Sequence, residues 1–335
     1  MNQFFKEKLE PKFSTINTQK NKFLFGQQHF ASLIFFEANL NCKYYFDLDM
    51  LETPHYKYLE NANNIYEKYL INSWTEYYKI PTNKINDKIK NYIDLKENIR
   101  KIKYNLVPVK LVRDFENNYI VWDGNHRVCI SIYEKIPLRA KIYSPEYYIS
   151  QIIKGDEYYA SGNRGIPYQS IYRNGEILLN GRRTDLYERI EMIDMNDLEN
   201  KSVVDFGCNL GMSLAIACEK GALDCLGLEM SNKIVTTAIR INIILKHPIR
   251  FQCADLSINK KFEKKFDTVF AFSIDKHINN DKILASNILN TSAKVLYFET
   301  HSNSDIPAQI KKISRKISLK GKTAQNRLFY KILLK

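Results

Sequence analysis

Hydrophobic positions recur with a helical period in the first hundred residues of the chain. Between residues 55 and 78, and again between residues 85 and 99, apolar side chains return every three or four positions. That interval places them on one face of a helix, so both stretches are predicted to be amphipathic helices. Pro81 is expected to end the first helix, because proline cannot continue the helical hydrogen bonds.

Short apolar runs then replace the helical period. Residues 107–112 and 119–122 predict two strands, because their apolar side chains are clustered and bounded by polar turns. A helix to about Lys135 follows, and residues 138–143 predict one more strand. This half of the chain is therefore expected to be a small α+β domain.

A segment rich in Gly, Asn, Tyr and Arg comes next, at residues 155–183. Its glycines and Pro167 interrupt any regular period, so the segment is interpreted as a connector or cap. Thr184 is placed to start a helix that runs through Ile193.

From residue 202 onward, predicted strands and helices alternate regularly. Such alternation is typical of a parallel sheet with helices on both faces. A helix near residues 306–316 and two strand-like runs, 317–323 and 327–334, end the chain and predict an antiparallel hairpin at the sheet edge. The alternating strands are predicted at 202–206, 225–228, 250–253, 268–272 and 295–299, and the helices at 212–220, 232–245 and 281–290.

The composition is that of a globular protein with a basic surplus. The mean hydropathy is −0.38, and no apolar run approaches the ~20 residues of a membrane span. The six cysteines form no CxxC pair and the N-terminus has no secretion signal, so we expect a cytoplasmic protein with reduced thiols and no metal site. The net charge of +13 permits an anionic partner, RNA included.

A glycine-rich turn carries the clearest chemical signal. Asp205 closes a predicted strand, and Gly207, Asn209 and Gly211 follow at alternate positions before a predicted helix. Small residues there let a ligand approach the backbone, and the start of a helix favours polar or anionic groups. Asn209 tolerates left-handed backbone angles better than most residues.

Two acids stand at the ends of the next two predicted strands. Glu229 lies 22 residues after Gly207, where a carboxylate can accept hydrogen bonds from both ribose hydroxyls. Asp255 follows the third strand and is placed to contact an adenine amino group. The turn and the acids together predict an adenosine-containing ligand.

These residues resemble the class I S-adenosylmethionine-dependent methyltransferases, whose turn reads Asp-x-Gly-x-Gly-x-Gly. Asn209 departs mildly from that pattern, while Gly207 and Gly211 do not fit the GxGxxG spacing of nicotinamide dehydrogenases. The resemblance implies a Rossmann-like seven-stranded methyltransferase sheet and S-adenosylmethionine as cofactor. It also implies cofactor contacts from Ser273 and an ion pair of Arg189 with the cofactor's carboxylate.

The methyl acceptor is expected beyond the fourth and fifth strands. His277, Glu299 and His301 follow those strands, where ligands of open α/β sheets bind, and a neutral histidine there can take a hydroxyl proton. The alternative is that these side chains only pack or cap. No Asn/Asp-Pro-Pro-aromatic motif and no Pro-Cys pair is present, so oxygen is the favoured acceptor atom. Arg182 or Arg183 is placed to meet an anionic substrate.

A second motif lies in the N-terminal half and opens a predicted helix. It consists of Asp123, Gly124, Asn125, His126 and Arg127. Helix-start amides beside a histidine and an arginine form a phosphate cradle. The motif resembles the ParB/sulfiredoxin-like fold, and this implies binding of a nucleotide or phosphosugar; the alternative is a purely structural turn.

Two departures limit this second resemblance. Asn125 stands where sulfiredoxins have a reactive cysteine, and Ile130 stands where partition proteins have a small residue. Neither sulfinic-acid reduction nor chromosome partitioning is therefore expected.

The sequence as a whole predicts an enzyme of two domains. Residues 1–150 form the ParB/sulfiredoxin-like α+β domain, 151–190 a connector, and 191–335 the methyltransferase domain. The expected reaction is O-methylation of a phosphorylated small molecule or a glycan precursor. The alternatives are an RNA methyltransferase and a nucleotide- or cofactor-sensing module without catalysis.

Overall fold

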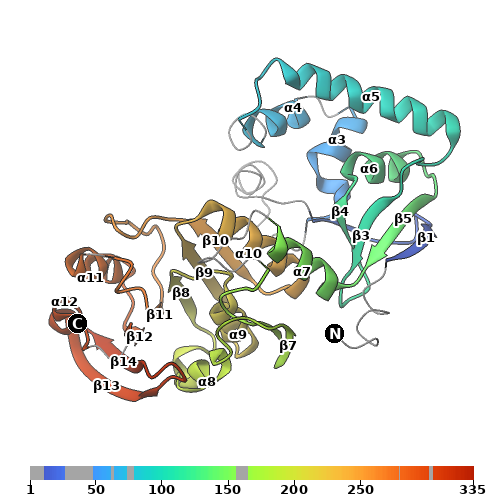
Figure 1. Cartoon of the computed structure of the whole chain (residues 1–335). Coiled ribbons are helices and arrows are strands. Elements are labelled where there is room, and N and C mark those ends of the chain that lie inside the picture. The colour runs from blue at the N-terminus through green and yellow to red at the C-terminus, as the bar shows by residue number, and fades with distance from the viewer. Residues whose placement is uncertain are drawn as a thin grey trace. The chain divides into compact units, whose positions relative to one another are not determined.

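The computed structural model describes residues 11–26, 48–61, 64–73, 79–155, 165–278, 280–301 and 305–335. The chain divides into two compact units, which Figure 1 colours from blue to red along the sequence. The first unit extends to Ile152 and includes Ile239–Lys246. The second unit contains Ile153–Ala238 and His247–Lys335.

The first unit is built on a mixed sheet, whose described strands have the order β1-β5-β3-β4-β2. The central strand β3 pairs antiparallel with β4 and parallel with β5. The three strands predicted from sequence are β3, β4 and β5, while β1 and β2 were missed. The strands are β1 (Lys12–Ile16), β2 (Phe23–Phe25), β3 (Val109–Arg113), β4 (Tyr119–Asp123) and β5 (Leu138–Tyr143).

The helix predicted at 55–78 is wrong as a single element. Two short helices occupy its described part, α3 (Pro54–Leu59) and α4 (Ile65–Leu70). Asn61 and Asn64 between them have φ angles of 63° and 76°, and such left-handed residues end a right-handed helix. Residues 74–78 of the prediction lie outside the described residues.

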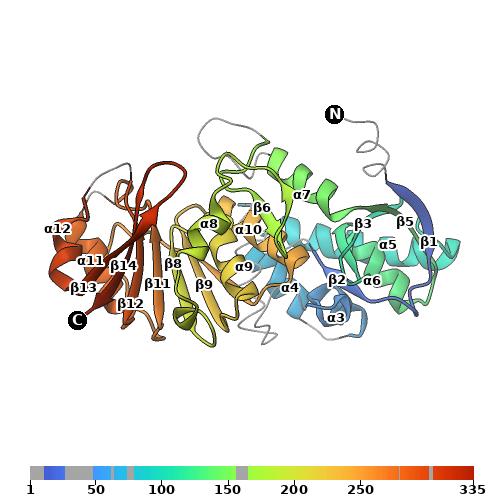
Figure 2. The ribbon, with the colours of Figure 1, turned by 90° about the horizontal axis from the view of Figure 1, so that it is seen from below.

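The other helices of this unit follow the sequence pattern more closely. The predicted amphipathic helix is α5 (Lys84–Ile102), which buries Ile85, Tyr92 and Ile99 on one face. The helix α6 (Asn125–Tyr133) begins directly after β4 and packs against α3 and α5. The helix α7 (Pro145–Lys154) was not predicted. Figures 1 and 2 show the long helix α5 running beside α6.

The second unit contains the sheet predicted from the alternating pattern. Its described strands have the order β10-β9-β8-β11-β12-β14-β13, and all neighbours up to β12 are parallel. Three strands have the predicted bounds because buried apolar runs define them sharply. The parallel strands are β8 (Ser202–Phe206), β9 (Asp224–Glu229), β10 (Ile249–Cys253), β11 (Thr268–Phe272) and β12 (Val295–Glu299).

The predicted terminal hairpin closes one edge of this sheet. The strands β13 (Ser314–Lys322) and β14 (Leu328–Leu334) pair antiparallel, and β14 also runs antiparallel to β12. Figure 2 shows both red strands at that edge. A reversed last strand of this kind is the feature expected of the methyltransferase sheet and not of a dehydrogenase sheet.

Helices cover both faces of this sheet. On one face, α11 (Asp281–Asn290) and α12 (Ala308–Ile313) pack on a core that includes Phe206 and Phe298. The helix α9 (Met212–Glu219) contacts β8, β9 and β10, and α10 (Asn232–Leu245) connects β9 to β10. No helix in the described ranges is long and apolar enough to cross a membrane.

The segment expected to be a connector folds as part of the second unit. Its described part forms a small hairpin, β6 (Ile171–Arg173) and β7 (Glu176–Leu179), followed by α8 (Leu186–Glu191). Backbone bonds join Ser170 N to Arg183 O at 2.9 Å and Arg183 N to Tyr168 O at 2.8 Å. These bonds place residues 168–170 beside residues 182–183.

Candidate functional site

A cavity of about 620 Å³ opens at the carboxyl ends of the parallel strands in the second unit. Residues that follow β8, β9, β10 and β11 line it, together with residues 168–169 and 182–183. Open α/β sheets bind their ligands at this edge, next to the strand at which the strand order reverses. In this sheet that strand is β8, because β9 and β10 lie on one side of it and β11 and β12 on the other. The cavity is therefore the candidate active site.

The glycine-rich turn forms the floor of the cavity between β8 and α9. Gly207, Asn209 and Gly211 have φ angles of 75°, 52° and 77°, so all three adopt left-handed backbone. A side chain at Gly211 would place its Cβ 2.6 Å from the ring of Phe251. This position therefore requires glycine, whereas Asn209 supplies the same left-handed conformation with a side chain.

Two carboxylates follow the neighbouring strands, as expected. Glu229 ends β9 and accepts hydrogen bonds from the backbone nitrogens of Asn209 at 3.2 Å and Ser231 at 3.1 Å. Asp255 follows β10 and accepts bonds from the backbone nitrogen and hydroxyl of Ser257, which hold its pKa below the ordinary value. Both carboxylates line the cavity, where their oxygens can accept hydrogen bonds.

Apolar side chains fill the wall between these two acids. The wall contains Leu228, Met230, Ile234, Ala254 and Leu256. A flat apolar group with polar edges, such as a purine, matches a wall of this kind flanked by acceptors.

Asp205 lies deeper in the cavity and is only 3% exposed. Burial raises the pKa of Asp205 to about 8, and nearby Glu229 adds to the rise while the charge of Arg189 opposes it. The carboxyl group is therefore mostly protonated at neutral pH. A cation placed beside it would favour its ionised form.

Arg189 reaches the cavity from α8 and is 1% exposed. Its Nη1 donates to Glu299 at 3.3 Å, and its Nε lies 3.9 Å from a carboxylate oxygen of Asp185. Two of its nitrogens, Nε and Nη2, make no hydrogen bond within the described part of the chain. Buried donors of this type are rarely left unsatisfied, so they fit a ligand with an anionic group.

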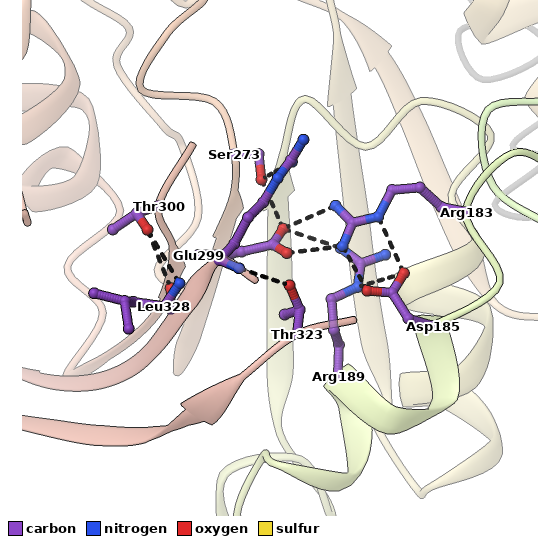
Figure 3. Close-up of polar contacts among 9 residues, drawn as sticks. Arg183, Asp185, Arg189, Ser273, Glu299, Thr300, Thr323 and Leu328 are labelled. Atoms are coloured by element: carbon purple, nitrogen blue, oxygen red, sulfur yellow. Dashed lines mark hydrogen bonds and ion pairs between the residues drawn. The ribbon is translucent and has the colours of Figure 1, made fainter. Parts of the chain in front are cut away.

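Several of the lining residues also belong to a buried ion-pair network, whose contacts Figure 3 shows. Arg183 donates to Asp185 at 2.7 and 3.0 Å and to Glu299 at 2.8 and 3.2 Å. Ser273 Oγ donates to Glu299 at 2.7 Å. Burial acts to raise the pKa of Glu299, but the two arginines and Ser273 outweigh it and keep that pKa below its ordinary value.

Glu299 therefore differs from our expectation for a catalytic residue. Its side chain is fully buried and accepts bonds from three neighbours, instead of facing an acceptor. Arg183 is one of the two arginines, with Arg182, that were expected to meet an anionic substrate, and its side chain donates to both Asp185 and Glu299. The network holds the segment 182–189 against β12.

His277, which follows β11, and His301, which follows β12, both line the cavity. His277 sits in a turn closed by its backbone nitrogen donating to Ile274 O at 2.8 Å, and the Ile274 side chain occupies the space above Gly207. Burial and the charges of Lys276 and Arg327 lower the pKa of His301, so this imidazole is neutral at pH 7.

Ser273 also lines the cavity, with a φ angle of 58° that is uncommon for a residue with a side chain. Its backbone nitrogen donates to Glu299 O at 2.8 Å, which holds it in that conformation.

Polar residues outside the set predicted from sequence also line the cavity, among them Gln169, Ser213 and Arg327. Gln169 Oε1 and Ser213 Oγ are buried and make no hydrogen bond among the residues described. The position of Ser213 next to the glycine-rich turn was a usable signal. Nothing local in the sequence marks Arg327, because it reaches the cavity through the pairing of β14 with β12.

The N-terminal motif has a different setting, in the first unit. Gly124 has a φ angle of 102° and precedes α6, and Asn125 is buried at its start. His126 Nε2 lies 2.5 Å from the hydroxyl of Tyr66. Burial, His55 and nearby cations lower the pKa of His126 well below its ordinary value.

Arg127 of this motif is also engaged with the protein itself. Its Nη1 donates to the carbonyl oxygens of Val107 at 2.8 Å and Pro108 at 3.3 Å, and its Nη2 lies 3.7 Å from Asp123. These contacts favour the structural alternative for the turn. The phosphate-binding role of the motif and the ParB/sulfiredoxin-like resemblance stay predictions.

The comparisons with known proteins concern methyltransferases. No family model matches the chain. Phosphoethanolamine N-methyltransferase 3 of Arabidopsis thaliana is 26% identical over 118 residues, which are 35% of this chain and 23% of that protein. The match thus spans less than a quarter of the length of the curated relative.

Several solved structures share part of the fold. The bifunctional kinase-methyltransferase WbdD covers 45% of this chain and 40% of its own, with 16% identity and a TM-score of 0.38. Magnesium protoporphyrin IX methyltransferase from Synechocystis PCC 6803, solved with bound S-adenosylmethionine, covers 45% of this chain and 78% of its own, with 17% identity and a TM-score of 0.36.

The N-terminal domain of EvdMO1 was solved in the presence of S-adenosylhomocysteine and D-fucose. It covers 50% of this chain and 91% of its own, with 12% identity and a TM-score of 0.40. The strand order and the reversed last strand give the second unit the fold of class I S-adenosylmethionine-dependent methyltransferases. The cofactor predicted from sequence agrees with these comparisons.

Proposed function

We propose that the protein is an S-adenosylmethionine-dependent methyltransferase whose active site is the cavity of the second unit. One observation carries the proposal. The cavity brings together the left-handed turn at Gly207, the carboxylates of Glu229 and Asp255, and the unsatisfied guanidinium nitrogens of Arg189. Both the adenosine end and the amino-acid end of S-adenosylmethionine would therefore meet side chains of suitable chemistry.

The residues present fit this cofactor group by group. Glu229 would accept the ribose hydroxyls and Asp255 the adenine amino group, with the apolar wall between them. Arg189 would bind the carboxylate through Nε and Nη2, and buried Asp205 would face the ammonium group. When bound, the cofactor supplies a methyl group already activated by its sulfonium.

The chain's own contribution to the reaction is positioning and acceptance of one proton. A hydroxyl acceptor held on the side of His277 would give its proton to that imidazole as the new bond forms. Holding both reactants in line supplies much of the rate acceleration, because the encounter becomes intramolecular. We prefer His277 as the base because of its position relative to the glycine-rich turn. Its backbone nitrogen donates to Ile274 O, and the Ile274 side chain lies over Gly207.

A phosphorylated small molecule or glycan precursor is the acceptor class we favour. The name of the plant relative specifies a phosphorylated acceptor. The acceptor side of the cavity is bordered by Arg182 and Arg327, which suit an anionic group.

Incubation with methyl-labelled S-adenosylmethionine and fractionated cell extract tests this function. We expect label in the small-molecule or glycan fraction, at a rate at least a hundredfold lower for His277→Ala. His247→Ala, a histidine outside the cavity, is the matched control and should keep the wild-type rate. Label in RNA would favour the alternative acceptor class, and no transfer to any fraction would refute the enzymatic function.

A further inference from the structure

The cavity has two sides of opposite charge. The acids that line it are Asp205, Glu229 and Asp255, which lie in or shortly after the strands β8, β9 and β10. The other side is bordered by cations and imidazoles: Arg182, His277, His301 and Arg327. The buried carboxylates Asp185 and Glu299 pair with Arg183 and Arg189, and within the described ranges neither pairs with Arg327.

Arg327 and His301 stand next to each other at the edge of the sheet. The antiparallel pairing of β12 with β14 continues past the strand ends, because Thr300 N donates to Leu328 O at 3.0 Å and Leu328 N donates to Thr300 Oγ1 at 3.2 Å. Figure 3 shows this pair of residues. His301 follows Thr300, and Arg327 precedes Leu328 on the paired segment. Both residues line the cavity.

The guanidinium of Arg327 is unlike those of the buried network. Its Nη1 donates to Ser273 Oγ, and within the described ranges it forms no ion pair with a carboxylate. An arginine side chain has five N–H donors, so most of its donors remain for a ligand. Asp275 Oδ2 accepts from the backbone nitrogen of His301 at 3.3 Å, and its Oδ1 makes no hydrogen bond within the described part of the chain.

We propose that Arg327, with His301 beside it, binds an oxyanion of the methyl acceptor, either a phosphate or a carboxylate. An acceptor anchored there would present its hydroxyl toward His277 and the glycine-rich turn. The inference rests on the proposed function, because it assigns this side of the cavity to the acceptor.

Binding of simple anions tests the site without knowledge of the acceptor. The full chain, saturated with S-adenosylhomocysteine, is titrated with inorganic phosphate and separately with malonate, and thermal unfolding reports binding. Sodium chloride at equal ionic strength corrects for screening. We expect saturable stabilisation of the wild type by at least one of the two anions, and the identity of that anion distinguishes a phosphate-bearing from a carboxylate-bearing acceptor.

Variants on one hairpin make the test specific. Arg327→Gln should weaken anion binding about tenfold or more, as expected for the loss of a charged hydrogen-bond partner. Arg327→Lys, which keeps the charge, should retain part of the affinity and separates anion binding from folding. Arg315→Gln removes the same charge from an exposed position of β13 and should bind as the wild type does.

Three results would overturn the inference. These are no stabilisation of the wild type beyond that of sodium chloride, equal losses for Arg315→Gln and Arg327→Gln, or unchanged anion binding by Arg327→Gln. The affinity for S-adenosylhomocysteine, measured in the same samples, reports on the proposed function separately. If the wild type failed to bind it, that function would fail, and the anion titration of the free protein would still decide on Arg327.

Discussion

Cofactor binding should release a proton from Asp205. Burial raises the pKa of this carboxyl to about 8 in the free protein, although the field of Arg189 opposes the rise. At pH 7 roughly nine in ten molecules therefore carry a proton there. The ammonium group of the cofactor would favour the ionised carboxylate, so binding is linked to loss of that proton.

The size of this linkage follows from the pKa of Asp205. Affinity for S-adenosylhomocysteine should fall about tenfold for each pH unit well below 8, and roughly a hundredfold in all between pH 9 and pH 6. Near pH 7, binding should release about 0.9 proton per site. Asp205→Asn cannot titrate and should lose this pH dependence.

The same pKa has a consequence for the stability of the free protein. The folded pKa of about 8 lies above the ordinary value of 3.8, so the folded state binds the proton more tightly than the unfolded state. Between about pH 4 and pH 8, Asp205 ionises in the unfolded state but stays protonated in the folded state, so the free energy of unfolding falls as the pH rises. At pH 7 the loss is on the order of 4 kcal/mol relative to pH values below 4. Asp205→Asn should unfold at a higher temperature than the wild type at pH 8.

Titration calorimetry between pH 6 and pH 9, in two buffers with different ionisation heats, measures both the affinity and the protons released. Asp205→Asn is titrated with the same ligand, so the ligand's own titration cancels in the comparison. Equal pH profiles for the wild type and Asp205→Asn, or no proton release at pH 7, would refute the reasoning.

Three further outcomes follow from buried contacts. Glu299→Gln leaves two buried arginines without their full acceptor and should cost about 3–5 kcal/mol in urea unfolding; a loss under 1 kcal/mol would contradict the role of the network. Gly211→Ala brings a Cβ within 2.6 Å of Phe251 at a φ of 77°, and calorimetry should detect no cofactor binding; wild-type affinity would show that the turn relaxes. Burial and Lys88 lower the pKa of His55 to about 3, and burial lowers that of His126, so the unfolded state takes up more protons than the folded state. In Asp205→Asn, which lacks the opposing titration of Asp205, stability should therefore fall as the pH drops below about 6.5, by up to ~1.4 kcal/mol per pH unit for each histidine. Flat urea midpoints of this variant from pH 7 to pH 5 would contradict this.

Much of the second unit could be predicted from the sequence. The strands at 202–206, 268–272 and 295–299 have the predicted bounds, because each is a buried apolar run that ends where a polar turn begins. The positions of Glu229 and Asp255 at the cavity follow from the same rule, since parallel strands bring their carboxyl ends to one edge.

Long-range pairing explains what the sequence could not predict. β1 and β2 are short and pair with strands more than ninety residues away, so no local pattern marks them. The position of Arg327 depends on the pairing of β14 with β12. The bonds that bury Glu299 come from arginines more than a hundred residues earlier in the chain, so no local pattern marks them.

Titration of S-adenosylhomocysteine into the folded full-length protein tests the central claim most directly. We expect saturable binding of one molecule per chain, weakened by roughly ten- to a hundredfold in Glu229→Gln because a charged acceptor for the ribose hydroxyls is lost. Asp255→Asn, at the exposed end of the cavity, should weaken binding less. No binding by the folded wild type, or equal affinity for Glu229→Gln, would contradict the assignment of the cavity.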